Sequence, residues 1–285
     1  MSVRRVGVIG VGRMGAPIAG HLAAAGHEVL ALDPDPTAGA GLPAEVRRVA
    51  TDGELATCDV VLVLAGGHAV PAVLLDGDRL RPVWRDRDVL VCSTVDPAEM
   101  RALHEAAARD GGRLLDAPLC RGDHGARRGD LLALVGGSTE VLDRCSDVLG
   151  AFCSDVVHIG EAGAGQVAKL VNNMLLWSTI AAVVEGMRLA EGLGVRRGPL
   201  AEGLRKSSAD SWVLRTWDRP RELPWADEDM RLVLDAAARA GVSARVSDVV
   251  QQVIGDVRAS GVLADGGFGE PGWALPPHPD EPTMR

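Results

Sequence analysis

The segment that most constrains the fold of this chain lies at its N-terminus, where a short apolar run leads directly into three closely spaced glycines. Residues 5–9 read Arg-Val-Gly-Val-Ile, and Gly10, Gly12 and Gly15 follow in the pattern GxGxxG before a helix-like stretch over 16–25. The first glycine permits a tight turn, the second lets the backbone approach a pyrophosphate, and the third lets helix and strand pack closely. The segment therefore predicts a dinucleotide-binding strand–turn–helix unit.

The predicted cofactor site extends beyond the glycines. We expect the cofactor to contact the loop formed by Gly10, Val11, Gly12, Arg13, Met14 and Gly15. The next predicted strand, 28–32, ends in Asp33, whose carboxylate is well spaced to accept hydrogen bonds from the adenosine ribose hydroxyls. Asp33 would repel a 2'-phosphate, so NAD is favoured over NADP, although Arg13 could contact either a phosphate or solvent. Leu64 and Ala65, at the end of another predicted strand, are expected to line the same site.

Short apolar segments alternate with helix-like segments as far as about residue 160, which is typical of a doubly wound parallel sheet. We predict strands over 5–9, 28–32, 60–64, 89–92, 113–115, 131–135 and 156–159, and helices over 13–25, 97–110 and 139–150. Helices are predicted to follow over 165–192, 198–206, 227–240 and 243–260. The expected fold class is α/β. An N-terminal Rossmann domain with a doubly wound parallel sheet is predicted over 1–161, an all-α C-terminal domain over 162–265, and a flexible tail over 266–285.

The helix predicted over 165–192 is apolar except near its start, where Lys169 and Asn173 stand four residues apart. They project from the same side of the helix. The run after Asn173 has almost no polar face, so we expect the helix to lie inside the protein. A buried ammonium is costly unless it has partners or a task. Taken alone, Lys169 fits better with a side chain that extends to solvent.

Composition excludes several other functions. The net charge of -9 and the pI near 5.3 argue against nucleic acid or an anionic membrane surface as partner. The longest apolar run is interrupted by polar residues and falls short of a membrane span, and the N-terminus has no signal-peptide pattern. The five cysteines show neither CxxC nor Cys/His pairing, which suggests reduced thiols in the cytoplasm and no metal site.

Four motifs, in this order, resemble those of the beta-hydroxyacid dehydrogenases, the family that includes 3-hydroxyisobutyrate dehydrogenase and tartronate semialdehyde reductase. They are Gly10 to Gly15, Ser93-Thr94-Val95-Asp96-Pro97, Asp116-Ala117-Pro118-Leu119-Cys120-Arg121-Gly122, and Lys169 to Asn173. The resemblance covers residues 3 to about 262. It implies hydride transfer between NAD and a small anionic 3-hydroxyacid or its semialdehyde or oxoacid. It also implies a C-terminal domain like that of 6-phosphogluconate dehydrogenase, and contributes to our expectation of a homodimer or higher homo-oligomer.

The resemblance also implies roles for individual residues. Lys169 would be the general acid/base that exchanges a proton with the substrate hydroxyl, and Asn173 would hydrogen-bond the substrate carboxylate. Thr94 resembles the family position near both nicotinamide and substrate, although it fits equally well as part of a helix N-cap region. Gly163 and Gly165 would let the backbone come close to the ligand.

The chain departs from the family at two places. Cys120, Arg121 and Gly122, which we expect to bind substrate, stand where the family has Ser-Gly-Gly, and a thiol is a poorer donor than a hydroxyl. If Arg121 points inward it could bind a carboxylate, phosphonate or phosphate of a more anionic substrate; if it points outward it is a surface arginine. Glu228 stands where the family has a lysine near the cofactor, and Asp229 fits a charge at a helix N-terminus.

Two other functions stay open from the sequence. An imine reductase-like enzyme is disfavoured because Lys169 is retained and Asp33 opposes NADP. A catalytically silent NAD-binding protein used for sensing or assembly is conceivable from the changes at Cys120, Arg121 and Glu228. The intact pair Lys169 and Asn173 argues against it.

Overall fold

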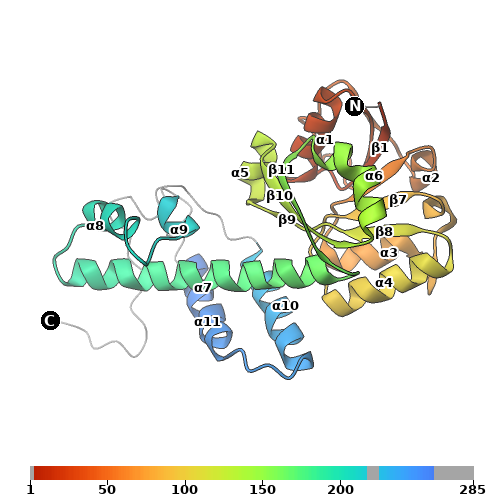
Figure 1. The fold of residues 1–285 in the computed structure, drawn as a ribbon. Helices are drawn as coiled ribbons and strands as arrows, with labels where there is room; N and C mark the ends of the chain where they lie inside the picture. Colours follow the sequence, from red (N-terminus) through yellow and green to blue (C-terminus); the bar gives the residue numbers. More distant parts are fainter. Residues whose placement is uncertain (1–2, 217–224, 260–285) are drawn as a thin grey trace. The chain divides into compact units, whose positions relative to one another are not determined.

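The computed structural model describes residues 3–216 and 225–259 of the chain (Figure 1). The chain divides into two compact units, Met1–Lys169 and Leu170–Arg285. The division falls within a single helix, α7 (Ala164–Gly192), so the first unit includes the beginning of that helix. The tail predicted over 266–285 lies outside the described residues.

The first unit is built on a sheet with the strand order β11-β10-β8-β7-β4-β1-β2-β3, in which β9 pairs with β10. The strands are β1 (Arg5–Ile9), β2 (Glu28–Leu32), β3 (Val46–Arg48), β4 (Val60–Val63), β7 (Asp88–Val91), β8 (Arg113–Asp116), β9 (Leu119–Cys120), β10 (Leu131–Gly137) and β11 (Cys153–Gly160). A separate hairpin joins β5 (Leu75–Asp76) and β6 (Arg79–Leu80). Pairing from β3 to β8 is parallel, as predicted. Strand β10 runs antiparallel to β8, so the sheet is mixed at that side rather than wholly parallel.

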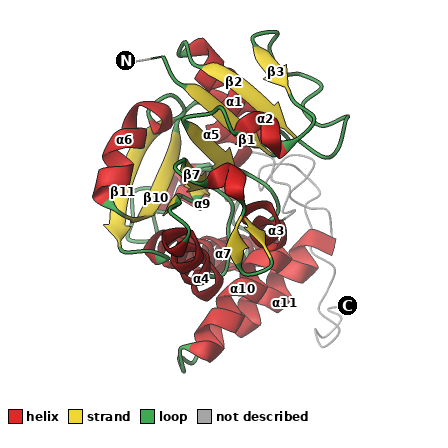
Figure 2. Ribbon diagram, turned by 90° about the vertical axis from the view of Figure 1, so that its right-hand side faces the viewer, coloured by secondary structure: helices red, strands yellow, loops and turns green. Residues whose placement is uncertain are grey.

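Helices cover both faces of this sheet, which is the doubly wound arrangement. One face carries α1 (Gly15–Ala24), α5 (Gly122–Arg128) and α6 (Thr139–Leu149), and Figure 2 shows α1 beside β1 and β2. The other carries α2 (Asp52–Leu55), α3 (Val70–Leu74), α4 (Pro97–Arg109) and the short 3-10 helices η1 (Gly67–Ala69) and η2 (Pro82–Trp84).

Strand β4 shows why the sheet is buried on both sides. All its residues are buried, and alternate residues of a strand point to opposite faces. Val60 and Leu62 belong to the core under α1 and α6, whereas Val61 and Val63 belong to the core under α3 and α4. A strand buried on both faces reads as a continuous apolar run, which is the pattern that its sequence shows.

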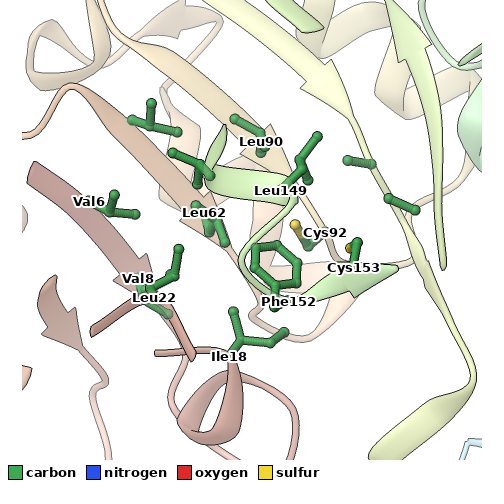
Figure 3. Close-up of a cluster of buried hydrophobic side chains, with 14 of the residues drawn as sticks. Val6, Val8, Ile18, Leu22, Leu62, Leu90, Cys92, Leu149, Phe152 and Cys153 are labelled. Carbon is green, nitrogen blue, oxygen red and sulfur yellow. The ribbon is translucent and has the colours of Figure 1, made fainter. Parts of the chain in front are cut away.

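The larger of these two cores centres on aromatic and branched side chains from elements far apart in sequence. Figure 3 shows the Phe152 ring with Ile18 of α1, Leu62 of β4 and Cys92 close to it. All five cysteines are free and buried. Burial raises the pKa of the Cys145 thiol to about 12, so this sulfur behaves as a small apolar group.

The second unit is helical in its described part, as predicted. It contains α7 from Leu170 onward, α8 (Arg197–Leu204), α9 (Trp212–Arg215), α10 (Ala226–Arg239) and α11 (Arg245–Ala259). Trp177, Ile180 and Val184 of α7 share a core with Met230 of α10 and Ile254 of α11.

Helix α7 is only partly buried, which corrects the expectation that it lies inside the protein. Leu175 is 57% exposed and Leu189 is 65% exposed. The expectation that this apolar segment falls short of a membrane span is wrong, because by length and composition alone α7 could cross a membrane. One side of it nevertheless forms the helical core just described. Core helices of proteins that never enter a membrane can have the same length and apolar composition.

Candidate active site

The first component of the site is the glycine loop at the carboxyl end of β1, where open parallel sheets bind ligands. Gly10 has φ +89°, a conformation that favours glycine, and a Cβ there would lie 2.8 Å from the Leu64 carbonyl group. A Cβ at Gly15 would lie 1.9 Å from the Gly10 carbonyl oxygen. Both glycines are therefore required by contacts within the protein.

Gly12 differs from these two glycines. A Cβ at Gly12 would meet no other atom of the described residues within 4 Å, so in this part of the chain the loop is open. Asp33, directly after β2, accepts a hydrogen bond from the Val11 amide at 2.8 Å, which fixes the carboxylate beside the loop. An open loop at the start of α1 with a carboxylate beside it fits a pyrophosphate and a ribose.

Arg13 and Met14 complete the loop. The Arg13 guanidinium forms an ion pair with Asp123 of α5 at 2.6 Å, although the arginine side chain is half-exposed. Arg13 thus joins the cofactor loop to the segment that follows Cys120. Met14 is the N-cap residue of α1.

Two further strands deliver predicted residues to the same edge of the sheet. Leu64 and Ala65 follow β4 and lie against Gly10. Ser93 and Thr94 follow β7; the Ser93 hydroxyl donates to the Ala65 carbonyl oxygen at 2.7 Å, and Thr94 is partly exposed. The helix N-cap beside Thr94 is supplied by Asp96, which accepts hydrogen bonds from the first turn of α4.

Lys169 lies on α7 at the end of the first unit and is only partly exposed. Its Nζ donates a hydrogen bond of 2.7 Å to the carbonyl oxygen of Leu119, the residue before Cys120. The two motifs that sequence analysis singled out therefore meet directly: the ammonium of one is held by the backbone of the other. This arrangement leaves an amine beside the loop expected to bind substrate.

Asp116, for which no role was predicted, is fully buried at the end of β8. Its carboxylate accepts hydrogen bonds from the backbone amides of Gly163 and Gln166 at 2.9 and 3.0 Å, and contacts His104 Nε2 at 3.2 Å. Burial alone would raise the pKa of Asp116, but His104 and the two amides outweigh it and hold the pKa below its usual range. An ionised carboxylate thus caps the start of α7.

The structure explains the need for glycine at Gly163 and Gly165 differently from the expectation that their backbone approaches a ligand. A Cβ at Gly165 would lie 2.3 Å from the Leu134 carbonyl oxygen, and one at Gly163 would lie 2.9 Å from Arg101 Cγ. Gly163 also has φ +83°. These glycines let α7 begin close to the sheet and to Asp116, and their contacts are with protein rather than with a ligand position.

The loop of Cys120, Arg121 and Gly122 shows which way the arginine points. Its guanidinium donates to Asp155 at 2.6 Å and to the Ser154 hydroxyl at 2.6 Å, both on β11, as well as to the Asp130 carbonyl oxygen. This is the outward alternative. Cys120 is buried on β9, whereas Gly122 is exposed at the start of α5.

In the second unit, Asn173 is 2% exposed on α7. Within the described residues its Nδ2 has no hydrogen-bond partner. A buried amide nitrogen without an acceptor is costly, so this donor is suited to a ligand oxygen. Glu228 is exposed in the first turn of α10, and Asp229 accepts a hydrogen bond from the Trp177 indole at 3.1 Å.

Two family models match consecutive parts of the chain. Residues 5–160 match the family model described as the NAD binding domain of 6-phosphogluconate dehydrogenase. Residues 163–267 match the model described as NAD-binding of NADP-dependent 3-hydroxyisobutyrate dehydrogenase.

Individual relatives agree with these models. A 3-hydroxyisobutyrate dehydrogenase of Pseudomonas aeruginosa is 36% identical over 225 residues, which are 77% of this chain and 74% of the relative. An NAD-dependent L-serine dehydrogenase of the same organism is 35% identical over 227 residues, 78% of this chain and 74% of the relative. The solved structure of Mycobacterium tuberculosis 3-hydroxyisobutyrate dehydrogenase with L-serine has a TM-score of 0.80 and 29% identity, and the similarity covers 94% of this chain and 97% of that one.

Proposed function

The chain belongs to the beta-hydroxyacid dehydrogenase family, and from that premise we propose that it interconverts a small 3-hydroxyacid and its semialdehyde, with NAD as redox partner and Lys169 as general acid/base. The family makes it an oxidoreductase acting on CH–OH groups. The residues proposed to bind cofactor and substrate are those at the carboxyl edge of the sheet and on α7.

The observation that carries this proposal is the identity and placement of Lys169. Only two of the 30 lysine and arginine residues are lysines, Lys169 and Lys206. An arginine stays charged and cannot exchange a proton near neutrality, whereas a lysine amine can. A chain that uses arginine almost everywhere keeps a lysine at the one position where the family chemistry needs proton transfer. Its Nζ is held by the Leu119 carbonyl beside the substrate loop.

The proposed chemistry uses few groups. In oxidation, Lys169 accepts the proton of the substrate hydroxyl, and in reduction it returns that proton. Bound nicotinamide supplies the hydride acceptor or donor. Asn173 would donate to the substrate carboxylate from its buried Nδ2, which has no partner among the described residues, and Thr94 would contact nicotinamide or substrate, as the family resemblance implies.

The substrate class follows from two features. The relatives' names give 3-hydroxyisobutyrate and L-serine as substrates. Both carry a carboxylate and a primary hydroxyl, with one carbon between the carboxylate carbon and the hydroxyl-bearing carbon. We propose the same class here, with one small substituent between these groups. The Arg121 guanidinium is engaged by Asp155 and Ser154, so a second anionic group on the substrate has less support than a single carboxylate.

The cofactor proposal depends on Asp33. Its carboxylate is fixed beside the loop by the Val11 amide, where it would accept hydrogen bonds from ribose hydroxyls and repel a 2'-phosphate. NAD is therefore proposed as the cofactor, and NADP would bind more weakly.

The test is a panel of 3-hydroxyacids, including 3-hydroxyisobutyrate and L-serine, followed at the NADH absorbance. The wild type is compared with Lys169→Ala and with Lys206→Ala, which removes the other, exposed lysine. We expect turnover in the wild type and in Lys206→Ala, and a loss of at least about 100-fold in Lys169→Ala. A wild type that binds NADH but turns over no member of the panel better than Lys169→Ala would instead be the silent cofactor-binding protein.

We also propose a homodimer or higher homo-oligomer that works in the cytoplasm. Strand β11 is at the side of the sheet and leaves Val156, Val157 and Ile159 between 38% and 46% exposed. An apolar strand at a sheet edge needs covering. Light scattering of the purified wild type and of Val157→Lys measures the oligomeric state of each. The five free, buried thiols suit a reducing compartment.

A further inference from the structure

The feature that carries a new inference is the way in which three separate loops of the first unit are connected. Asp116 ends β8, the Thr94 turn follows β7, and Lys169 belongs to α7. No two of these segments are adjacent to each other in the sequence. Two fully buried polar side chains, Asp116 and Gln166, link them through hydrogen bonds to backbone atoms.

Gln166 uses both polar atoms of its amide on the Thr94 turn. Nε2 donates to the Ser93 carbonyl oxygen at 2.9 Å, and Oε1 accepts from the Val95 amide at 2.9 Å. These partners are the residues on either side of Thr94. Since donor and acceptor are both used, the amide fixes the turn in position and orientation, and no residue with a single polar atom can replace it.

Asp116 holds the other end of the link. Its carboxylate accepts from the backbone amides of Gly163 and Gln166, so it fixes the first turn of α7. The backbone of Gly136 and Gly165 packs tightly against this carboxylate and holds it in place, because a Cβ on either glycine would lie within 2.7 Å of a carboxylate oxygen. Three residues after Gln166, Lys169 bonds Leu119, which is itself three residues after Asp116.

We infer that Gln166 and Asp116 are positioning residues that set Lys169 and Thr94 relative to each other. The inference rests on the proposed function for the meaning of Lys169, but the link itself is a structural one. Neither side chain touches the proposed reacting atoms. Small displacements of reacting groups cost large factors in rate, so breaking the link should lower kcat while cofactor affinity is retained.

The experiment uses two variants of Gln166 in the full chain. Gln166→Met keeps the length of the side chain and removes both hydrogen bonds. Gln166→Glu keeps the acceptor for Val95 but, when ionised, presents an oxygen instead of a donor to Ser93. The matched control is Gln252→Met, an exposed glutamine on α11.

Three measurements are made on each protein: kcat and KM for the best 3-hydroxyacid from pH 6 to pH 9, the Kd of NADH, and amide hydrogen exchange at Val95. For Gln166→Met we expect a kcat lower by about 10-fold or more, an NADH Kd within about 3-fold, and faster exchange at Val95. Gln252→Met should match the wild type.

Gln166→Glu separates positioning from simple loss of stability. The charged or titratable side chains around the site are Asp116, His104, Lys169 and Arg101 of α4. Burial and the adjacent Asp116 carboxylate favour the protonated form of the introduced carboxyl, and the Lys169 and Arg101 cations oppose it. Protonation restores a donor toward Ser93. The kcat of this variant, divided by that of the wild type at the same pH, should therefore rise as pH falls, which a merely less stable protein would not show.

The outcomes distinguish this inference from the proposed function. Unchanged exchange at Val95 in Gln166→Met, or a wild-type kcat in that variant, overturns the inference. A wild type without turnover overturns the proposed function, and faster exchange at Val95 would still establish the structural link. If Gln166→Met fails to fold, a pH-independent ratio for Gln166→Glu is the result that refutes positioning.

Discussion

Replacing Arg121 tests whether this residue serves the fold or the substrate. It is one of two described non-glycine residues with positive φ, at +82°, and occupies the position where the family has glycine. Left-handed backbone costs a residue with a Cβ about 1–2 kcal/mol. In return, the guanidinium reaches Asp155, and ion pairs between partly exposed side chains contribute about 0–1 kcal/mol.

Arg121→Gly removes the strain, and with it the ion pair and the hydrogen bonds to Ser154 and the Asp130 carbonyl oxygen, so the gain and the loss largely offset each other. The free energy of unfolding should change by about 1 kcal/mol or less, which moves Tm by roughly 4 °C at most for a chain of this size. Arg121→Ala removes the same ion pair but keeps the Cβ. We therefore expect the alanine variant to be less stable than the glycine variant by about 1 kcal/mol, the reverse of their usual order.

The assay combines thermal unfolding with kinetics. The ratio of kcat/KM for a monocarboxylic and a dicarboxylic 3-hydroxyacid is compared between wild type, Arg121→Gly and the exposed control Arg127→Ala. An outward Arg121 leaves this ratio within about 2-fold. A charged hydrogen bond to substrate is worth about 1.5–3 kcal/mol, so a drop beyond about 10-fold for the dicarboxylic substrate alone would refute the outward assignment.

The remaining predictions concern the glycine loop, the cofactor and acid stability. Gly15→Ala should destabilise the fold by about 2 kcal/mol or more in calorimetry, because its Cβ would overlap the Gly10 carbonyl. Gly12→Ala should unfold like the wild type but bind NADH at least about 10-fold more weakly in a fluorescence titration. Asp33→Asn should raise kcat/KM with NADPH relative to NADH, and a wild type that prefers NADPH would contradict the ribose assignment. Burial opposes ionisation of Asp88, but its hydrogen bonds to Arg144 and Arg113 prevail and lower its pKa. Because that pKa lies below the unfolded value of about 3.9, the stabilisation is present above about pH 4 and is lost as pH falls further, so Tm of Asp88→Asn should fall less steeply between pH 5 and 3 than that of the wild type.

Most of the fold was predictable because its long elements have clear periodicity. Strands β1 and β2 coincide with their predicted bounds, and α7 begins one residue earlier than expected. The short elements β9 and α5, by contrast, were not predicted, since a segment this short shows no clear period. Strand β10 was predicted over 131–135, but its antiparallel direction was not, because strand direction depends on the connection through β9 and α5 rather than on local sequence.

Residues of the candidate site could be proposed from the sequence where their type or spacing indicates a chemical role. Lys169 was proposed because a charged group in an apolar helix requires a reason, and Asp33 because it ends the strand that follows the glycine motif. Gln166, three residues before the Lys169 to Asn173 motif, had no role assigned from the sequence, because an amide near a helix start looks like ordinary surface. Only the structure shows that both of its polar atoms are buried and used. The direction of Arg121 likewise depends on β11, more than 30 residues away along the chain.

The carboxylate of Asp116 determines where this chain can be cut. A fragment ending at residue 161, the predicted domain boundary, would keep Asp116 and lose both amide donors, those of Gly163 and Gln166. Each lost hydrogen bond to a buried charge costs about 1.5–3 kcal/mol, a large share of the stability of a typical domain. A self-sufficient dinucleotide-binding module must therefore extend at least to Gln166, and the first compact unit, which ends at Lys169, includes the start of α7 and the proposed acid/base.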